Sequence, residues 1–149
     1  MLISEVMTED VVSAPREATL QAVAELMRDR HVGSVVIVDG ERPCALITDR
    51  DVALALGADG ASRGDPADPY ASRPIVTGHP DMDVEEAAAR MVQHGVRRLP
   101  VVSDDGALQG IATLDDLAIR TGDLKLAQQM TAEVARAALP EFFFHQRGG

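Results

Sequence analysis

The chain has 149 residues, 46% hydrophobic and 26% charged, and these proportions are typical of one folded globular domain rather than of a disordered chain. Fourteen basic residues against 24 acidic ones give a net charge of −10, with no long basic stripe, which argues against binding to nucleic acid or to an anionic membrane surface. A single cysteine excludes an internal disulfide, and no apolar run comes near the roughly 18 residues of a membrane span. We therefore expect a cytoplasmic protein.

The first half of the chain predicts the element order strand, helix, strand, strand, helix. Apolar residues recur at helical spacing after Thr19, and the nearly continuous apolar run 32–38 is typical of a strand that is covered on both faces. Asp39 and Gly40 supply turn residues that tolerate a positive φ. The expected elements are a strand at 11–13, a helix that ends near His31, strands at 32–38 and 44–48, and a helix that ends at Gly57.

The second half predicts the same order again, after a segment with the composition of a linker. Residues 57–69 contain three glycines and two prolines, which favours a linker without regular structure. At the first helix of this half, Asp83 is the expected N-cap and Glu86 completes a capping box. The expected elements are a strand at 75–77, a helix over 84–91, strands at 96–102 and 108–113, a helix that ends at Gly122, and a further helix at 123–139.

The chain contains an internal repeat. A shift of 64 residues sets 11–38 on 75–102, and a shift of 65 sets 45–57 on 110–122. One repeat of about 55–60 residues would bury too little surface to be stable alone, so the apolar strands of both copies must share an interface. We predict an α/β (α+β) fold of two β-α-β-β-α repeats about a pseudo-twofold axis. The expected divisions are repeat 1 at 1–60, a linker at 61–70, repeat 2 at 71–122, and a C-terminal helix and tail at 123–149, in which Phe142–Phe144 packs on its own domain or on a dimer mate.

An ordered set of short segments occurs in both copies. In the first copy these segments are Val6-Met7, Val11-Val12, Pro15, Thr19-Leu20, Gly33–Asp39 and Leu46–Asp51. In the second they are Arg73–Val76, the helix to Met91, Gly95–Val102 and Gly110–Leu117. Over roughly residues 3–122 the chain resembles a tandem pair of CBS domains, often called a Bateman module. Ala45 and Val36 stand where that family often has Gly and Pro, and both fall in the first copy, so we expect its ligand site to be the weaker one.

The resemblance implies a binding module rather than an enzyme. CBS pairs bind adenosine-containing ligands in the cleft between the repeats, so AMP, ADP, ATP and S-adenosylmethionine are the expected candidates. The ligand would be regulatory, so no cofactor is expected. A module of this kind signals to another protein, whose identity the sequence does not indicate. The resemblance also implies a homodimer formed through helices, in line with the apolar residues of the short helices, which are Val52, Leu54, Leu56, Leu117 and Ile119.

Thr48 and Asp51 are candidate ribose ligands, and Thr113 and Asp116 repeat the arrangement. Each pair is expected at the end of a strand and in the first turn of the next helix, where the two side chains converge. An ionised carboxylate accepts two hydrogen bonds, which suits the paired hydroxyls of a ribose, and a helix N-terminus favours a phosphate. Alternatively, each Thr and Asp only caps its helix, since both residue types are favoured there. The duplication and the family resemblance favour a ligand role.

Three arginines are candidate phosphate ligands. Arg50 lies between Thr48 and Asp51, whereas Arg97 and Arg98 are adjacent at a strand entrance, so alternation points at most one of that pair into the cleft. The alternative is that these arginines pair with neighbouring acids on the surface. No aromatic residue is available in either repeat to stack on adenine, so aliphatic side chains and backbone groups would hold the ring. The segments best placed for this are Val12-Ser13 and Val76-Thr77.

Other chemistries have little support in the sequence. The four histidines and Cys44 have no close metal-ligand spacing, so we expect no metal site. His31 and His94 are expected at helix ends, and Cys44 is expected to act as a small buried hydrophobic residue. No nucleophile motif or phosphate-binding loop occurs, which disfavours a small nucleotide hydrolase or transferase. The main alternative to a nucleotide sensor is a structural or interaction dimer that keeps the fold without functional sites.

Overall fold

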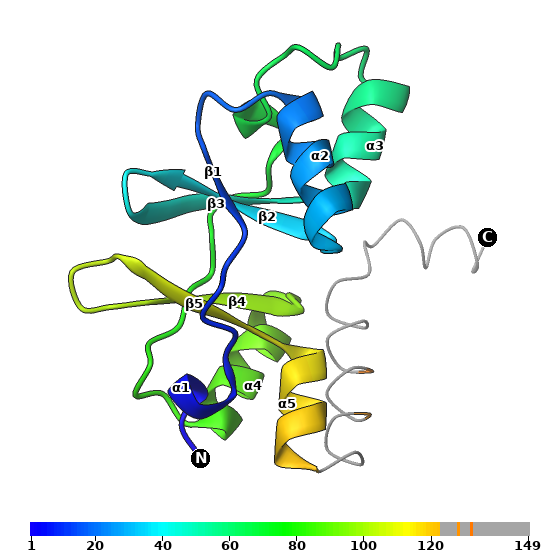
Figure 1. Ribbon diagram of the computed structural model, residues 1–149. Coiled ribbons are helices and arrows are strands. Elements are labelled where there is room, and N and C mark those ends of the chain that lie inside the picture. The colour runs from blue at the N-terminus through cyan, green and yellow to red at the C-terminus, as the bar shows by residue number, and fades with distance from the viewer. Residues whose placement is uncertain (123–127, 129–131, 133–149) are drawn as a thin grey trace.

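The computed structural model describes residues 1–122 together with 128 and 132, so the helix expected at 123–139 and the Phe142–Phe144 tail lie outside the described residues. In the described part, two halves lie one above the other, each with a sheet and helices (Figure 1). One half contains a three-stranded sheet of order β1-β2-β3, and the other contains the antiparallel pair β4-β5. The elements are α1 (Ile3–Val6), β1 (Ser13–Pro15), α2 (Leu20–Arg30), β2 (Ser34–Asp39), β3 (Arg42–Thr48), α3 (Asp49–Gly57), η1 (Asp68–Tyr70), α4 (Val84–His94), β4 (Arg98–Val102), β5 (Leu108–Thr113) and α5 (Leu114–Thr121).

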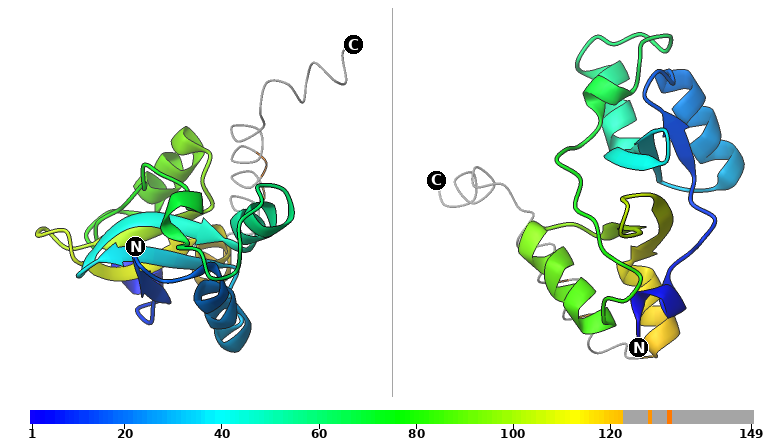
Figure 2. Two further views of the ribbon diagram at one scale, coloured as in Figure 1. Left: turned by 90° about the horizontal axis from the view of Figure 1, so that it is seen from above. Right: turned by 90° about the vertical axis from the view of Figure 1, so that its left-hand side faces the viewer.

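The two repeats are related by matching contacts, which confirms the predicted α+β class with duplicated architecture. Thr8 and Ile111 exchange backbone hydrogen bonds of 2.9 Å in both directions. Ser72 and Leu46 exchange the equivalent pair, of 2.8 and 3.2 Å. In both cases, the segment that leads into one repeat is bonded to the last strand of the other repeat: Thr8 to β5, and Ser72 to β3. Figure 2 shows the N-terminal segment in blue and the linker in green passing between the two halves.

The first strand of each repeat differs from the expectation. β1 forms at Ser13–Pro15 rather than at 11–13, and it pairs in parallel with β2. In the second repeat the strand expected at 75–77 does not form, and a single bridge joins Gly78 to Val101. The reason lies in the partner strand. In the first repeat the Val36 N–H donates to the Val12 carbonyl at 3.0 Å, whereas the equivalent residue of the second repeat is Pro100, which has no N–H.

The two hydrophobic cores exchange short segments of chain. Ile3, Val6 and Met7 are at most 9% exposed and belong to the core of the second repeat, together with residues of α4, β4, β5 and α5. In return Ala67, which is fully buried, belongs to the core of the first repeat. Each core therefore includes residues of the segment that precedes the other repeat.

The start of α4 depends on this exchange. The capping box expected from Asp83 and Glu86 does not form, and within the described residues the Asp83 side chain accepts no capping bond. Instead the Val84 N–H donates to the Met1 carbonyl at 3.0 Å, and Leu2 forms an antiparallel bridge with Asp83. The N-terminal segment thus supplies an acceptor for one of the N–H groups in the first turn of α4 that have no partner within the helix.

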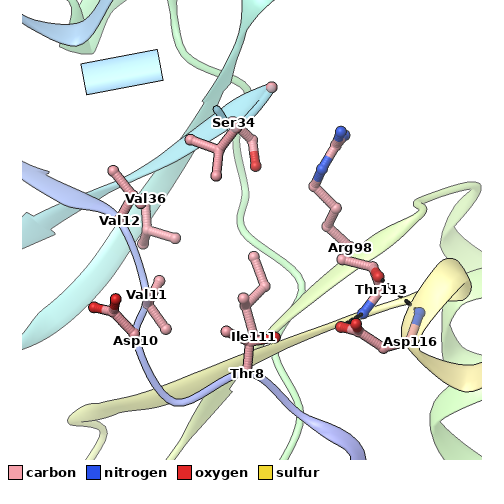
Figure 3. Close-up of a pocket in the computed structure, with 12 residues that line it drawn as sticks. Thr8, Asp10, Val11, Val12, Ser34, Val36, Arg98, Ile111, Thr113 and Asp116 are labelled. Carbon is pink, nitrogen blue, oxygen red and sulfur yellow. Dashed lines mark hydrogen bonds between the residues drawn. The ribbon is translucent and has the colours of Figure 1, made fainter. Parts of the chain in front are cut away.

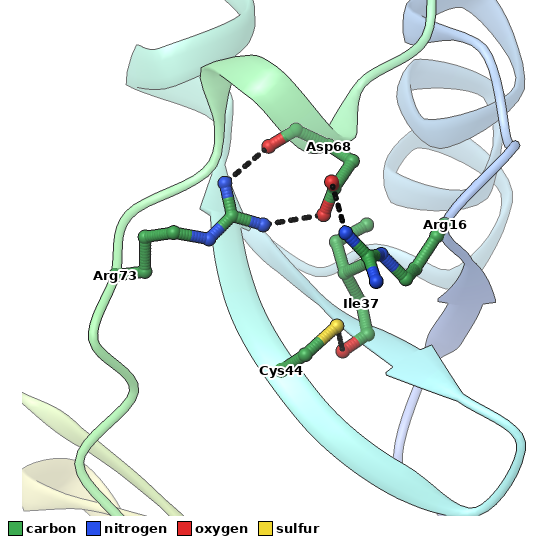
Figure 4. A network of polar contacts seen from close by, with 5 residues as sticks. All are labelled: Arg16, Ile37, Cys44, Asp68 and Arg73. Carbon is green, nitrogen blue, oxygen red and sulfur yellow. Dashed lines mark hydrogen bonds and ion pairs between the residues drawn. The ribbon is translucent and has the colours of Figure 1, made fainter.

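The segment expected to be an irregular linker is partly ordered against the first repeat. It forms the single turn η1, and Asp68 in this turn holds two arginines (Figure 4). Arg73 donates to the Asp68 carbonyl at 2.9 Å and to its carboxylate at 2.5 Å, while Arg16 lies 3.4 Å from the other carboxylate oxygen. The Asp68 side chain is only 15% exposed, and its contact with Arg16 joins the linker to the segment that follows β1, while Arg73 binds Asp68 from within the same part of the chain.

Candidate functional site

A cavity of about 260 Å³ lies between the two repeats (Figure 3). Its walls come from the segment before β1, from β2 and the residues just before it, from the start of β4, and from the end of β5 with the first turn of α5. It is a composite site, because neither repeat alone supplies all of its walls. The lining residues are Thr8, Asp10, Val11, Val12, Val32, Gly33, Ser34, Val36, Arg98, Ile111, Thr113 and Asp116.

Thr113 and Asp116 form the polar end of the cavity. Thr113 is the N-cap of α5, its hydroxyl oxygen accepts from the Asp116 N–H at 3.1 Å, and Asp116 Oδ2 accepts from the Thr113 N–H at 3.1 Å. The pair is therefore a capping box, as the alternative interpretation proposed. This capping role uses only one oxygen of the Asp116 carboxylate. Among the described residues nothing donates to Asp116 Oδ1, and both side chains are half-buried at the cavity wall.

Aliphatic side chains form the middle of the cavity. Val12 is 9% exposed and Val36 is 1% exposed, and Figure 3 shows both on the first-repeat side, across from Ile111. Val36 alternates with Val35 and Ile37, which belong to the core cluster beneath the helices, so Val36 faces the other repeat instead. The lining contains no aromatic residue. A flat apolar ring could be held here by side-chain packing rather than by stacking.

Arg98 supplies positive charge to the cavity. It begins β4, it is half-buried, and its side chain extends toward the first repeat rather than toward Asp116 (Figure 3). Its Nη2 lies 3.5 Å from the position that a Cβ on Gly33 would occupy. Within the described residues its guanidinium forms no ion pair or hydrogen bond. A half-buried cation without a partner in a cavity is suited to a bound anion.

A smaller cavity of about 130 Å³ adjoins the first one at the start of α5. Arg97, Arg98, Thr113, Leu114 and Asp115 line it. Arg97 is exposed and lines the smaller cavity but not the larger of the two, whereas Arg98 lines both. The expectation that strand alternation would separate the two arginines therefore holds for the main cavity and not for the smaller one.

The remaining predicted site residues lie outside the main cavity. Thr48 and Asp51 form an equivalent capping box of 2.9 and 3.1 Å at α3, and the Ser72 hydroxyl also donates to Asp51 Oδ2 at 3.5 Å. Predicted residues that do not line the cavity are Thr48, Asp51, Arg50, Arg97, Ser13, Val76 and Thr77. Ser13 lines a different cavity, of about 380 Å³, near the hairpin turns. The structure thus brings together Thr113, Asp116, Arg98 and Val12.

Several lining residues were not predicted from sequence. The sequence assigns Val36 to the site of the first copy, but Val36 lines the cavity of Thr113 and Asp116. Its departure from the family pattern therefore affects the cavity of the second-copy residues. Ile111 had a usable signal, because it lies two residues before Thr113 on one strand face. Thr8 and Asp10 had none, since they belong to an irregular segment placed by the exchange between cores.

Three further observations concern metal binding, membrane spans and Cys44 in the described residues. No group of three or more His, Cys, Asp or Glu side chains among them could hold a metal ion. No helix in the same part of the chain is both long and apolar enough to cross a membrane. Cys44 is half-buried and its thiol donates to the Ile37 carbonyl at 3.3 Å (Figure 4).

Two curated relatives match the chain in sequence, and one solved structure matches it in fold and sequence. The chain is 36% identical over 137 residues to the CBS domain-containing protein YhcV of Bacillus subtilis, covering 92% of this chain and 91% of that protein. It is 38% identical over 117 residues to the uncharacterized protein MK0525 of Methanopyrus kandleri, covering 77% of this chain and 60% of that protein. The CBS domain protein PAE2072 from Pyrobaculum aerophilum, solved as a complex with AMP, superposes with a TM-score of 0.75 at 32% identity, covering 86% of this chain and 99% of that one.

The family assignment rests on both repeats. The model of the CBS domain matches residues 3–58 and again residues 67–120, which together make up most of the chain. These two matches begin with the segments that the structure exchanges between the cores, so each match includes the piece that packs on the other repeat. The resemblance inferred from the sequence is confirmed, and the chain belongs to the CBS-domain family as a tandem pair.

Proposed function

We propose that this CBS pair is a regulatory module that binds an adenosine-containing ligand in the cavity between its repeats. The observation that carries the proposal is the set of groups in one cavity: Thr113 with Asp116, aliphatic walls, and the unpaired Arg98. The AMP complex of PAE2072, at 32% identity and nearly full coverage, supports AMP as the first ligand to test. ADP, ATP and S-adenosylmethionine are further candidates.

Each part of such a ligand has a matching group. The free Oδ1 of Asp116 can accept from a ribose hydroxyl while Oδ2 keeps its capping bond at 3.1 Å. The adenine ring would lie among Val12, Val36 and Ile111. The phosphate would then point to Arg98 and toward the smaller cavity, where α5 begins. Because walls from both repeats contact the ligand, its binding would change how the repeats pack together.

The proposed role is regulatory and not catalytic, so the signal must pass to another protein. The apolar residues expected at a dimer interface separate into two groups. Val52 and Leu117 are buried within their own repeats, at 7% and 3% exposure. Leu54, Leu56 and Ile119 are 42%, 41% and 78% exposed. We propose that these three residues contribute to a homodimer through α3 and α5, which sedimentation at tens of micromolar would reveal as a species of twice 15.9 kDa.

Calorimetry with AMP tests the ligand site, and Asp116→Ala is the decisive variant. Loss of a charge-assisted hydrogen bond worth roughly 1.5–3 kcal/mol should weaken AMP binding at least tenfold. The fold itself should lose only about 1 kcal/mol, as for a lost cap. Asp51→Ala is the matched comparison, because it breaks the equivalent box with a similar loss of stability and should affect affinity less.

The opposite result would favour a ligand-free structural or interaction dimer. In that case wild-type protein shows no thermal shift with AMP, ADP, ATP or S-adenosylmethionine, although a ligand at 100 times its Kd should add about 2.7 kcal/mol of stability. If wild type binds and Asp116→Ala binds equally well, the protein is a nucleotide sensor whose ribose lies elsewhere.

A further inference from the structure

Four ionised side chains surround the place where the phosphate of the proposed ligand would lie. Arg97 and Arg98 carry the positive charges, and Asp115 lines the smaller cavity together with them. Asp49, the first residue of α3, comes from the other repeat. Its Oδ2 lies 3.4 Å from the position of a Cβ on Gly33, and Arg98 Nη2 lies 3.5 Å from the same point. Asp49 and Arg98 are therefore close, although they form no ion pair.

The positive charge available for phosphate is limited. Among the described residues, Arg98 is the one basic residue that lines the main cavity, and Arg97 adds a second charge at the smaller one. Inside the main cavity Asp116 is anionic, while Asp10 is compensated by Arg30 at 2.6 Å. One phosphate, with a charge of about −1.5 to −2 at pH 7, is matched by two arginines. The linings of the two cavities, as far as the described residues go, contain no third basic residue, so a longer chain of phosphates would come near the carboxylates of Asp49 and Asp115.

The arrangement around Arg98 occurs at one cavity only. By the shift that relates the repeats, the counterpart of Asp49 is Leu114, the counterpart of Gly33 is Arg97, and the counterpart of Arg98 is Ser34. The guanidinium of Arg98 and the Asp49 carboxylate both lie beside Gly33, where an added Cβ would be in ordinary van der Waals contact with each of them. The carboxylate near the phosphate position is thus specific to the cavity of Thr113 and Asp116.

We propose that this cavity selects a nucleoside monophosphate over the corresponding triphosphate, and that Asp49 and Asp115 set the preference. The inference rests on the proposed function, because it takes the ribose at Asp116 and the phosphate at Arg98. Like charges that lie close together in a partly enclosed site repel strongly, and the net charge of −10 adds a repulsive field for polyanions. AMP gains from the two arginines, whereas ATP places two additional phosphates against carboxylates.

Calorimetric titration of adenosine, AMP, ADP and ATP into the full chain, without Mg²⁺ and at low ionic strength, tests the preference. AMP should bind more tightly than adenosine, and at least roughly tenfold more tightly than ATP, which corresponds to about 1.4 kcal/mol. The difference should shrink in about 1 M salt, where the Debye length falls to roughly 3 Å. ADP should lie between AMP and ATP.

Three variants separate local repulsion from net charge. Asp49→Asn and Asp115→Asn should each raise ATP affinity several-fold while changing AMP affinity less, so that the AMP-to-ATP ratio falls. Asp59→Asn is the control, because it removes one negative charge at an exposed position beyond α3 and should leave the ratio unchanged. Asparagine keeps an acceptor at position 49 for the Arg50 N–H, which now donates to Asp49 at 2.8 Å.

The outcomes distinguish this inference from the proposed function. If ATP binds as tightly as AMP, or if all three variants change the ratio equally, the preference is not set by these carboxylates and the inference is wrong, while the nucleotide site stands. If none of the four compounds binds, the proposed function fails and the inference fails with it. A falling ratio in Asp49→Asn and Asp115→Asn, with Asp59→Asn unchanged, supports both.

Discussion

The two repeats differ in the side chains that pack where an incoming segment crosses the last strand of a sheet. In each, an incoming segment crosses the last strand of the sheet and exchanges two backbone hydrogen bonds with it. Met7 crosses at Gly110, where an added Cβ would lie 2.7 Å from the Met7 sulfur and 2.9 Å from the Thr8 carbonyl oxygen. At the equivalent crossing, Ala45 is fully buried and Ala71 packs against its core. The pair Met7 and Gly110 at one crossing thus corresponds to the pair Ala71 and Ala45 at the other.

The second difference concerns the first strand and the carbonyl groups that it leaves available. The Val12 carbonyl accepts from the Val36 N–H at 3.0 Å, which completes a third strand in the first repeat. Pro100 cannot make the equivalent bond, and among the described residues nothing donates to the Val76 carbonyl. The duplicated halves therefore differ at this position: the Val12 carbonyl beside the cavity of Arg98 is bonded within the sheet, whereas the Val76 carbonyl accepts from no described residue.

The largest effect is expected when the exchanged segments are separated from their cores. Fragments 1–64 and 9–72 have equal length, but only 9–72 contains every member of the first core cluster, including Ala67. Fragment 1–64 instead carries Ile3, Val6 and Met7, whose core is missing. In urea unfolding followed by circular dichroism, neither fragment should be as stable as the full chain, but 9–72 should keep more cooperativity than 1–64. A cooperative transition in 1–64 that equals or exceeds that of 9–72 would contradict the exchange.

A smaller effect is expected at the crossing of Met7 and Gly110. Gly110→Ala forces a clash and should lower the free energy of unfolding by about 1–3 kcal/mol, as for an overpacked core. Ala45→Gly at the equivalent crossing should cost only about 0.5–1 kcal/mol. Met7→Ala alone leaves a cavity and should cost about 2–5 kcal/mol.

The double variant Met7→Ala with Gly110→Ala reproduces the alanine pair of the first repeat. Its loss of stability should be smaller than the sum of the two single losses, because the smaller side chain makes room for the added methyl group. Chemical denaturation of the four proteins measures this coupling. Strictly additive losses would show that the two crossings are not complementary in the way described.

The smallest effect concerns the second hairpin turn, which is longer than the first. The Ser103 hydroxyl donates to the Asp105 carboxylate, and this bond, with a backbone contribution from Ala107, lowers the pKa of Asp105 below its ordinary value. A lowered pKa stabilises the fold above the unfolded value and loses that effect as the pH falls through the folded value. Ser103→Ala should raise the pKa of Asp105, which carboxyl NMR titration detects; an unchanged value would assign the shift to the backbone.

The sequence predicted those features that depend on local pattern. The helices, the hairpin strands and the duplicated Thr and Asp pairs follow from periodicity and spacing, and the pairs at 48 and 113 are found where expected. The prediction of a strand at 75–77 was wrong, because Pro100 in the partner strand has no N–H to pair with that segment. The cavity was only partly predicted, since Thr8 and Gly33 enter it through contacts between segments distant in sequence.

The exchange of segments also sets an order of events during synthesis of the chain. The first core can be completed once Ala67 has been made, but Ile3, Val6 and Met7 have their partners in a region that extends to Leu117. At about 5–20 residues per second, the N-terminal segment is exposed for on the order of ten seconds before its place exists. It is short, and acidic Glu5 interrupts its apolar residues, which limits aggregation during this interval. The cavity between the repeats includes both Thr8 and Ile111, which are hydrogen-bonded to each other, so it cannot form before the second repeat has been made.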